Sequence, residues 1–350
     1  MTAPLSTPAL VVDLEAFDAN VAAMSDLLRG TAKTVRPHMK THRTPELAKR
    51  QLGGSAVGVT CATVGEAEVM VEAGITDVLI ANEVVTVAKL ARIAQLARAA
   101  DVTVAADHPD AVAALSREAT RVGVSVGVLI DVDILLHRCG VASVSEALAL
   151  AQTIEAAAGV RLAGIMGYEG RVRLATERRE ERIAGAYAAL SETRAALLEA
   201  GHHVGVVSAA GTSTLREAIA DPTITEIQAG VYCLMEPELL PMELPFRCAV
   251  TVRGTVISRH PDHFVADVGR RVVGVEYGPP QLVGLEATQV SLSDEHATVT
   301  VSGIPPELGA AVDFIPGQIR TTFNLHDRVW VSRGGDIVDC WPVSARGRSQ

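Results

Sequence analysis

The sequence predicts an α/β protein: a (β/α)8 barrel with a second, mostly β domain. Over the first 230 residues or so, short apolar runs alternate with segments that repeat apolar residues every three or four positions. These are the patterns of strands and of helices. After about residue 245 the helical period gives way to short alternating runs separated by turn residues. The length of 350 residues fits this division, because such a barrel takes about 250 residues.

Eight apolar runs are predicted as the barrel strands. A strand, a helix and a second strand of the same sheet require parallel pairing, and eight such units favour a closed barrel over an open sheet. Gly74 and Gly201 lie just past two of the predicted helices, where a helix C-cap favours glycine. The eight runs are 34–36, 56–60, 77–81, 102–106, 125–131, 161–166, 204–208 and 224–228.

The second domain is predicted to be discontinuous. Residues 7–14 have the pattern of a strand, and we expect this strand to pair with the carboxyl-terminal module rather than with the barrel. The barrel is then residues 15–242, and the β domain is residues 1–14 together with 243–350. Strands of the module are expected at 248–258, 264–268, 287–293, 297–302, 328–332 and 336–341.

Composition excludes several classes of protein. The net charge of −10 disfavours nucleic acid as a partner, because phosphate backbones are repelled. The five cysteines are odd in number and show no CxxC spacing, so we expect reduced thiols, without a zinc site or a disulfide. Residues 1–8 lack the pattern of a signal peptide, and no apolar run approaches the roughly 20 residues of a membrane helix. We expect a cytoplasmic enzyme that binds neither nucleic acid nor a membrane.

Lys40 lies where the first predicted barrel strand ends, in the run Arg-Pro-His-Met-Lys-Thr-His-Arg over residues 36–43. Active sites of such barrels lie at the carboxyl ends of the strands. The two arginines and the two histidines of this run, His38 and His42, disfavour the ammonium form of the lysine. Only the neutral amine condenses with an aldehyde, so the position predicts a lysine that holds an aldehyde cofactor. The alternative is a solvated loop lysine, the usual place of this residue type.

Polar residues also follow other predicted strands. Their placement on one rim favours a site, although each has a structural alternative. Asn82 and Asp107 would cap the next helix, and Asp131 and Asp133 would pair with Arg138. The polar residues after the later strands are Tyr168, Glu169 and Ser208.

The run from Ser208 to Thr214 leaves the seventh predicted strand with small residues, hydroxyls and backbone N–H groups at the start of a helix. Such a run is a phosphate cradle, and the alternative is an ordinary Ser/Thr cap. Barrels commonly bind phosphate after strands seven and eight, and residues 228–232 follow the eighth. Together with Lys40 the cradle fits pyridoxal 5′-phosphate, an aldehyde that carries a phosphate. Arg138 would then face its phenolic oxygen.

These segments resemble the D-threonine aldolase and D-serine dehydratase family, which has the alanine-racemase-like fold, pyridoxal phosphate fold type III. The likeness spans nearly the whole chain, and the lysine run, the Tyr-Glu-Gly segment and the phosphate loop recur in order. The matching segments are 7–13, 36–43, 61–68, Asp131 with 137–140, 167–170, 211–212, 226–230 and 341–348.

The resemblance implies a role for each of several residues. Lys40 would form a Schiff base with the cofactor, Arg138 would contact its O3′ side, and Tyr168 would lie at the pyridine nitrogen. The resemblance also implies a homodimer that acts on a small amino acid. Phosphate would be held by Gly211, Thr212 and Tyr232, with Ser208 and Gln228 as further candidate cofactor ligands.

The chain departs from the family at the metal site. The resemblance implies a histidine and an aspartate or cysteine, two positions apart, that hold a divalent cation. Gln318 and Arg320 stand there instead, and both are expected on one face of a strand over residues 316–324. Arginine cannot be a ligand because it is always charged. His326 and Asp327, just beyond, are interpreted as structural, and we predict no catalytic metal.

Arg320 offers a fixed charge and a fork of donors in place of the cation. It would either substitute for the metal at the substrate's β-hydroxyl or bind a second acidic group of the substrate. The alternative is a salt bridge to an acid such as Asp313. We include Arg320 and Gln318 among the candidate catalytic residues, with His38 or His42 as the general base.

The favoured function is that of a lyase, an aldolase that cleaves a D-β-hydroxy amino acid to glycine and an aldehyde without a divalent metal. Two alternatives stay open. One is a pyridoxal phosphate-dependent racemase, dehydratase or transaminase-type enzyme on a D-amino acid; a racemase needs a second base, for which Tyr277 or Tyr168 would serve. The other is a pyridoxal phosphate-binding protein without turnover.

Overall fold

The computed structural model describes residues 5–170, 172 and 176–350, in two compact units. The barrel unit comprises Ser25–Lys40, Ala48–Gly230 and Arg348–Gln350. The β unit comprises Met1–Met24, Thr41–Leu47 and Val231–Gly347. Helices α1 (Leu14–Leu28) and α2 (Pro45–Leu52) each contribute to both units. The domain limits predicted at residues 14 and 242 stay a prediction.

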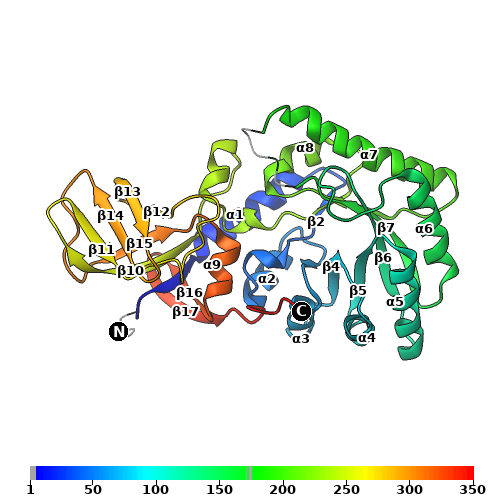
Figure 1. Ribbon diagram of the computed structural model, residues 1–350, viewed down its shortest axis with the longest axis horizontal. Coiled ribbons are helices and arrows are strands. Elements are labelled where there is room, and N and C mark those ends of the chain that lie inside the picture. Colours follow the sequence, from blue (N-terminus) through cyan, green and yellow to red (C-terminus); the bar gives the residue numbers. More distant parts are fainter. Residues whose placement is uncertain (1–4, 171, 173–175) are drawn as a thin grey trace. The chain divides into compact units, whose positions relative to one another are not determined.

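The barrel unit is built on an eight-stranded sheet in the order β2-β9-β8-β7-β6-β5-β4-β3, with every neighbouring pair parallel (Figure 1). Two isolated parallel bridges, Val35 with Ala56 and His38 with Thr60, join the two ends of this order. The predicted barrel is therefore confirmed. Its strands are β2 (Thr34–Val35), β3 (Val59–Cys61), β4 (Asp77–Glu83), β5 (Asp101–Ala106), β6 (Val126–Val132), β7 (Val160–Gly167), β8 (Val206–Ala209) and β9 (Glu226–Ile227).

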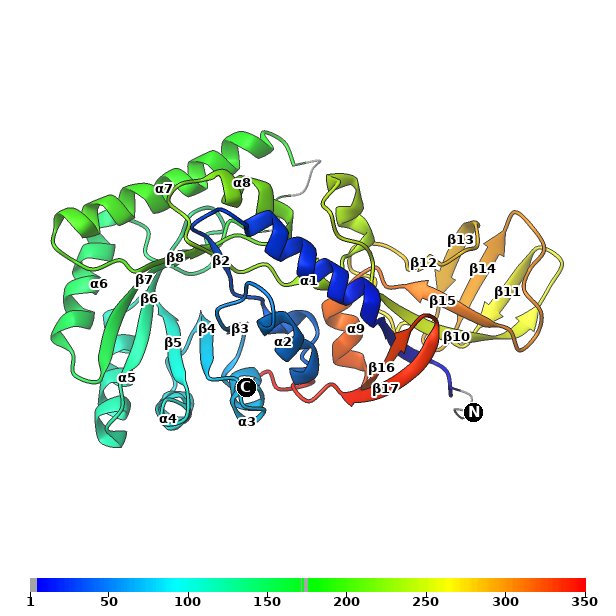
Figure 2. The same cartoon turned by 180° about the vertical axis from the view of Figure 1, so that it is seen from behind.

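Helices lie outside this sheet, as Figure 2 shows from behind. They are α3 (Val64–Glu72), α4 (Val87–Leu96), α5 (Pro109–Val122), α6 (Val144–Ala156), α7 (Arg179–Glu199) and α8 (Leu215–Ala220). The hydroxyls of Thr63 and Ser143 cap α3 and α6 by accepting backbone N–H groups three residues on. Gly74 and Gly201 follow their helices with φ of +90° and +89°, as the sequence predicts. Leu79, Ala105, Leu129 and Met166, from four neighbouring strands, pack together in a buried cluster.

The β unit contains a sheet in the order β13-β14-β11-β10-β1-β16-β17, with β15 beside β10 and β12 beside β15. Strand β1 (Ala9–Asp13) pairs antiparallel with β10 (Val250–Arg259) and parallel with β16 (Arg328–Arg333), which confirms the pairing predicted for residues 7–14. The other strands are β11 (His263–Ala266), β12 (Gln281–Leu282), β13 (Ala287–Leu292), β14 (Ala297–Val301), β15 (Ala311–Ile315) and β17 (Asp336–Pro342).

The strand predicted over residues 316–324 is wrong, because Ile319–Leu325 forms helix α9. Gln318 is its N-cap, and its Oε1 accepts the Thr321 N–H at 2.9 Å. Ile319, Thr322 and Phe323 are fully buried, at the spacing of one helix face. Gln318 is thus a helix cap and Arg320 lies in the first helical turn, so the two do not share one face of a strand as expected.

Candidate functional site

Tyr168, just after β7, lies among three other predicted site residues of the barrel unit. The Nζ atom of Lys40 is 5.8 Å from the centroid of the Tyr168 ring, and Cζ of Arg138 is 5.9 Å from it. A Cβ atom placed on Gly211 would lie 3.7 Å from Cε2 of Tyr168. The loops after β2, β6, β7 and β8 thus bring the predicted amine, guanidinium, ring and phosphate loop together, as expected at the carboxyl ends of barrel strands.

Arg36 does not contribute to the positive charge expected around Lys40. Its guanidinium pairs with Oε2 of Glu226 at 2.7 Å and with Oδ1 of Asp77 at 2.5 Å. Burial opposes the charge of Arg36, but the two carboxylates outweigh burial and raise its pKa. Asp77 and Glu226 begin their strands, so this guanidinium lies toward the amino ends of the barrel strands, away from the rim.

Ser208 and Gln228 are joined to each other inside the barrel unit. Nε2 of Gln228 donates to Oγ of Ser208 at 3.0 Å, and this hydroxyl donates to Oε1 of Glu226 at 2.6 Å. The Ser208 side chain is fully buried. Because its one donor is used within the protein, the structure gives it a supporting contact, and cofactor binding by Ser208 or Gln228 stays a prediction.

The structural alternatives for Asn82, Asp107 and Asp133 are wrong. Helix α4 follows Thr86, and α5 is capped by Nδ1 of His108, so Asn82 and Asp107 cap neither helix. Instead Asp107 accepts the Gly140 N–H at 3.0 Å, two residues beyond Arg138. Asp133 pairs with His137, with 2.8 Å between Oδ2 and Nδ1.

Glu83, at the end of β4, is a site residue that sequence reasoning missed, although it lies only two positions past the predicted strand 77–81. Its carboxyl group hydrogen-bonds with Asp131, the acid expected to pair with Arg138. Burial, and then the bond and the charge of Glu83, raise the pKa of Asp131 to about 8, while Arg138 opposes this. Burial and Glu83 also raise the pKa of the Cys139 thiol to about 11. The pair thus lies beside the loop that carries Arg138.

The raised pKa of Asp131 predicts a pH-dependent stability. A carboxyl whose pKa is higher in the folded state contributes most to stability when it is protonated, and that contribution is lost as the pH rises from its usual pKa toward about 8. Asp131→Asn removes the titration. We expect the free energy of unfolding of the variant to increase relative to that of the wild type as the pH rises. Urea unfolding of the two proteins between about pH 5 and about pH 9 measures this difference. A constant difference across this range would contradict the assignment.

His42 and Tyr232 belong to the packed interior of the β unit. His42 is fully buried, its Nδ1 accepts the Thr44 N–H at 3.2 Å, and its ring meets Phe323 edge to face at 6.3 Å. The Tyr232 ring packs against Phe246 at 5.6 Å. The roles predicted for these two residues stay predictions.

Arg320, also in the β unit, is held by two side chains. Its Nη2 donates to the Tyr277 hydroxyl at 2.9 Å and lies 3.8 Å from Oε1 of Glu236. The Glu236 side chain is fully buried, and the same Oε1 accepts the Ile319 N–H. The alternative of a salt bridge to an acid is met by Glu236 and not by Asp313, because Asp313 takes both of its bonds, at 2.8 Å, from Arg253 on the neighbouring strand.

The residues present do not fit the divalent cation that the resemblance implies. Gln318 uses its amide oxygen as a helix cap, and Arg320 is a cation. Nε2 of His326 lies 2.8 Å from the Val272 carbonyl, and burial lowers the pKa of this histidine. Across residues 5–170, 172 and 176–350, no group of three or more His, Cys, Asp or Glu side chains is placed to hold a metal ion.

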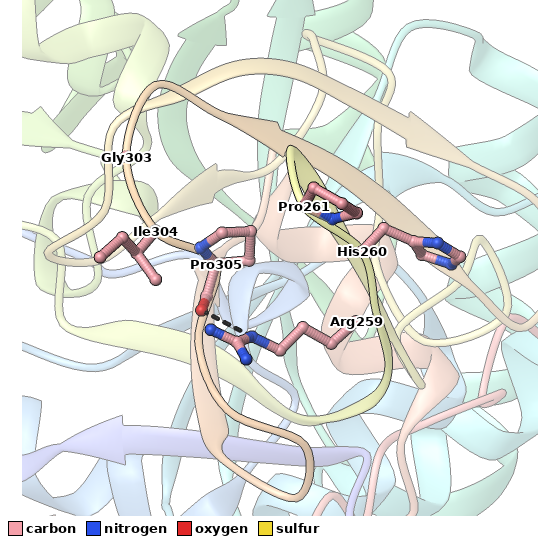
Figure 3. A pocket seen from close by; sticks show the side chains of 6 residues that line it. All are labelled: Arg259, His260, Pro261, Gly303, Ile304 and Pro305. Carbon is pink, nitrogen blue, oxygen red and sulfur yellow. Dashed lines mark hydrogen bonds between the residues drawn. The ribbon is translucent and has the colours of Figure 1, made fainter.

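A pocket of about 370 Å³ lies between two loops of the β unit (Figure 3). Nε of Arg259 donates to the Pro305 carbonyl at 3.1 Å across it. None of the predicted site residues lines it. The lining residues are Arg259, His260, Pro261, Gly303, Ile304 and Pro305.

The family model for the alanine racemase N-terminal domain matches residues 12–237, and that for a putative serine dehydratase domain matches residues 249–332. A D-threonine aldolase of Arthrobacter sp. is 37% identical, over 99% of this chain and 94% of that protein. The chain belongs to the D-threonine aldolase family. A 3-hydroxy-D-aspartate aldolase of Paracoccus denitrificans (strain Pd 1222) is 31% identical, over 98% of this chain and 93% of that protein.

Solved structures of this family agree with the fold. The crystal structure of D-threonine aldolase from Filomicrobium marinum matches with a TM-score of 0.94 at 34% identity, over 98% of this chain and 96% of that one. D-threo-3-hydroxyaspartate dehydratase from Delftia sp. HT23 matches with a TM-score of 0.82 at 25% identity, over 97% of each chain. The predicted family and alanine-racemase-like fold are therefore confirmed. In the part of the chain that the structure covers, no helix is both long and apolar enough to cross a membrane.

Proposed function

We propose that this chain is a pyridoxal phosphate-dependent lyase that cleaves a D-β-hydroxy amino acid to glycine and an aldehyde without a divalent metal. The observation that carries the proposal is the gathering of Lys40, Arg138 and Gly211 around Tyr168 in a member of the D-threonine aldolase family. Its partners would be a small amino acid and a second copy of the chain, and we expect it in the cytoplasm.

The donor set around Tyr168 fits pyridoxal 5′-phosphate. Lys40 supplies the amine for the aldehyde, Arg138 a permanent cation for the phenolic oxygen, and the loop at Gly211 and Thr212 the groups for the phosphate. The Tyr168 ring adjoins both Lys40 and Gly211, so a cofactor attached to this lysine would have the phosphate loop beside it. When bound, this cofactor supplies an electron sink that weakens the bonds to the Cα atom of an amino acid.

Cleavage of the Cα–Cβ bond also requires a base that takes the proton of the β-hydroxyl. Of the two predicted bases, the structure favours His38. His38 precedes Lys40 by two residues in the barrel unit, whereas Nδ1 of His42 is held by the Thr44 N–H within the β unit. We propose that His38 accepts the proton.

We propose that Arg320 supplies the positive charge that a divalent cation would otherwise supply to the substrate. Gln318 would fix the start of the helix that carries Arg320. Tyr277 and the buried carboxylate of Glu236 hold its guanidinium in one orientation. A guanidinium fixed in this way stabilises an oxyanion or binds a carboxylate of the substrate. Metal removal should then leave turnover unchanged.

The test is incubation of the holoenzyme with D- and L-β-hydroxy amino acids, with and without EDTA. Glycine and an aldehyde, formed from the D-isomers and insensitive to EDTA, are the expected result. Loss of turnover with EDTA, restored by a divalent metal, would contradict the metal-independent reaction. A keto acid and ammonia would indicate the dehydratase alternative, which is favoured by a D-threo-3-hydroxyaspartate dehydratase of Delftia sp. (strain HT23), 32% identical over 66% of this chain.

Two further outcomes separate the remaining alternatives. Exchange of the Cα proton in deuterated water without cleavage would indicate racemase or transaminase-type chemistry. Cofactor absorbance without cleavage or exchange would indicate a binding protein without turnover.

A further inference from the structure

Glu169 is a buried acid beside Tyr168 for which the proposed reaction has no use. Its side chain is 2% exposed, and it follows β7 in the barrel unit. Its Oε1 accepts a hydrogen bond from the Thr214 hydroxyl and lies 3.5 Å from the Tyr187 hydroxyl. The backbone N–H of Ala210 lies close enough to this carboxyl group to favour its charged form. Glu169 therefore contacts the phosphate loop at both of its ends.

The loop between these two contacts has a conformation that needs support. Ala210 has φ of +71°, in the left-handed region that residues with a Cβ atom rarely adopt. Such a conformation persists where its surroundings hold it, and the Glu169 carboxyl beside the Ala210 N–H is one such support. The next N–H, that of Gly211, donates to Oγ1 of Thr214 at 3.1 Å. A chain of hydrogen bonds thus runs from Gly211 through Thr214 to Glu169.

Burial shifts the ionisation of Glu169 toward its uncharged form. It raises the pKa of this carboxyl, although Thr214, Ala210 and Tyr187 oppose the rise. The protonated form carries no charge and does not repel a phosphate. Oε1 acts as an acceptor in either form.

We propose that Glu169 is the positioning residue of the phosphate loop, holding Thr214, and through it the N–H of Gly211, so that the backbone at Gly211 and Thr212 keeps the shape that receives the phosphate of the cofactor. The inference rests on the proposed cofactor site. Glu169 contacts the phosphate loop. We therefore expect Glu169 to affect the binding of the phosphate group, and not the formation of the covalent bond at Lys40.

The test compares how apo protein binds pyridoxal 5′-phosphate and pyridoxal, which lacks the phosphate. Affinities come from equilibrium dialysis, and borohydride reduction followed by mass spectrometry reports attachment at Lys40. Wild type should prefer the phosphate ester. Glu169→Ala and Thr214→Val should reduce this preference by about tenfold or more, as expected when a hydrogen bond to a buried carboxyl is lost, with pyridoxal binding unchanged.

Two matched variants separate positioning from general damage. Glu169→Gln keeps an acceptor oxygen at the same place and Thr214→Ser keeps the hydroxyl, so both should retain the preference of the wild type. If Glu169→Ala does not fold, Thr214→Val decides, because valine has the shape of threonine and leaves no cavity. Retained preference in Thr214→Val, or a loss in Glu169→Gln as large as that in Glu169→Ala, would overturn the inference.

Failure of the proposed function gives a different result. Wild type that attaches neither aldehyde at Lys40, or binds both equally, would overturn the cofactor site and this inference with it. A wild-type preference that all four variants keep would overturn only the role of Glu169.

Discussion

Lys40→Ala should abolish the covalent attachment of the cofactor and lower turnover at least about a thousandfold, the scale expected when a residue acting directly in catalysis is lost. The reason is chemical, since alanine has no amine to condense with an aldehyde. The measurements are the visible absorption band of bound cofactor and the mass of the protein after borohydride reduction. Of the substitutions considered, this one has the largest expected effect.

Lys49→Ala is the matched control for this prediction. Lys49 is an exposed lysine of α2, so its loss should leave both the absorption band and turnover unchanged. A band that persists in Lys40→Ala, with an adduct on another lysine, would contradict the assignment of Lys40 and the cofactor site built around it.

The barrel and much of its rim were predictable because both follow from patterns local to the sequence. Alternating strand and helix periods give parallel strands, and the carboxyl ends of parallel strands meet on one rim. Residues that directly follow different strands therefore come together without any knowledge of contacts. Lys40, Arg138, Tyr168 and Gly211 were found in this way, and the structure gathers them.

The pairing of charged residues was not predictable, because sheet register sets it. Arg253 and Asp313 are 60 residues apart and lie directly opposite each other on β10 and β15, which leaves Glu236 as the acid nearest Arg320. Strand β15 was itself missed. Glu83 on β4 and Asp131 on β6 are separated in the sheet by β5, so nothing in the sequence indicated that Asp131, which was expected to pair with Arg138, also forms a hydrogen bond with a second carboxyl.

Helix α9 shows how a short segment misleads. Its seven residues have buried positions at Ile319, Thr322 and Phe323, a helical spacing, yet residues 316–324 also fit an alternating strand. The N-cap bond of Gln318 decides between the two, because it satisfies a backbone N–H that a helix start leaves without a partner. The residue types at positions 318 and 320 could be read from the sequence, but the geometry of these two residues could not.

Arg320→Ala should lower kcat/KM by about a hundredfold to a thousandfold, the usual effect of removing a donor that stabilises a developing oxyanion. The substitution also leaves the carboxylate of Glu236 buried without the guanidinium 3.8 Å away, so the unfolding temperature must be measured beside turnover. Arg253→Ala is the control, because it removes a guanidinium of the same unit from its own acid, Asp313. Turnover that survives in Arg320→Ala would contradict the proposed role of Arg320.

The double substitution Gln318→His with Arg320→Asp tests whether metal ligands introduced at these two positions make the protein bind a divalent cation. It supplies an imidazole and a carboxylate, both ligands of divalent ions, beside the buried Glu236. Without a cation the buried carboxylate of Glu236 loses the guanidinium 3.8 Å away and gains a second negative charge on the adjoining helix, so the variant should be less stable than the wild type. Mn²⁺ should restore its unfolding temperature and leave the wild type unchanged, because a ligand stabilises only the protein that binds it. Turnover in this variant should depend on Mn²⁺ and be lost with EDTA, whereas an equal response of wild type and variant to Mn²⁺ would show that the natural residues already bind the metal.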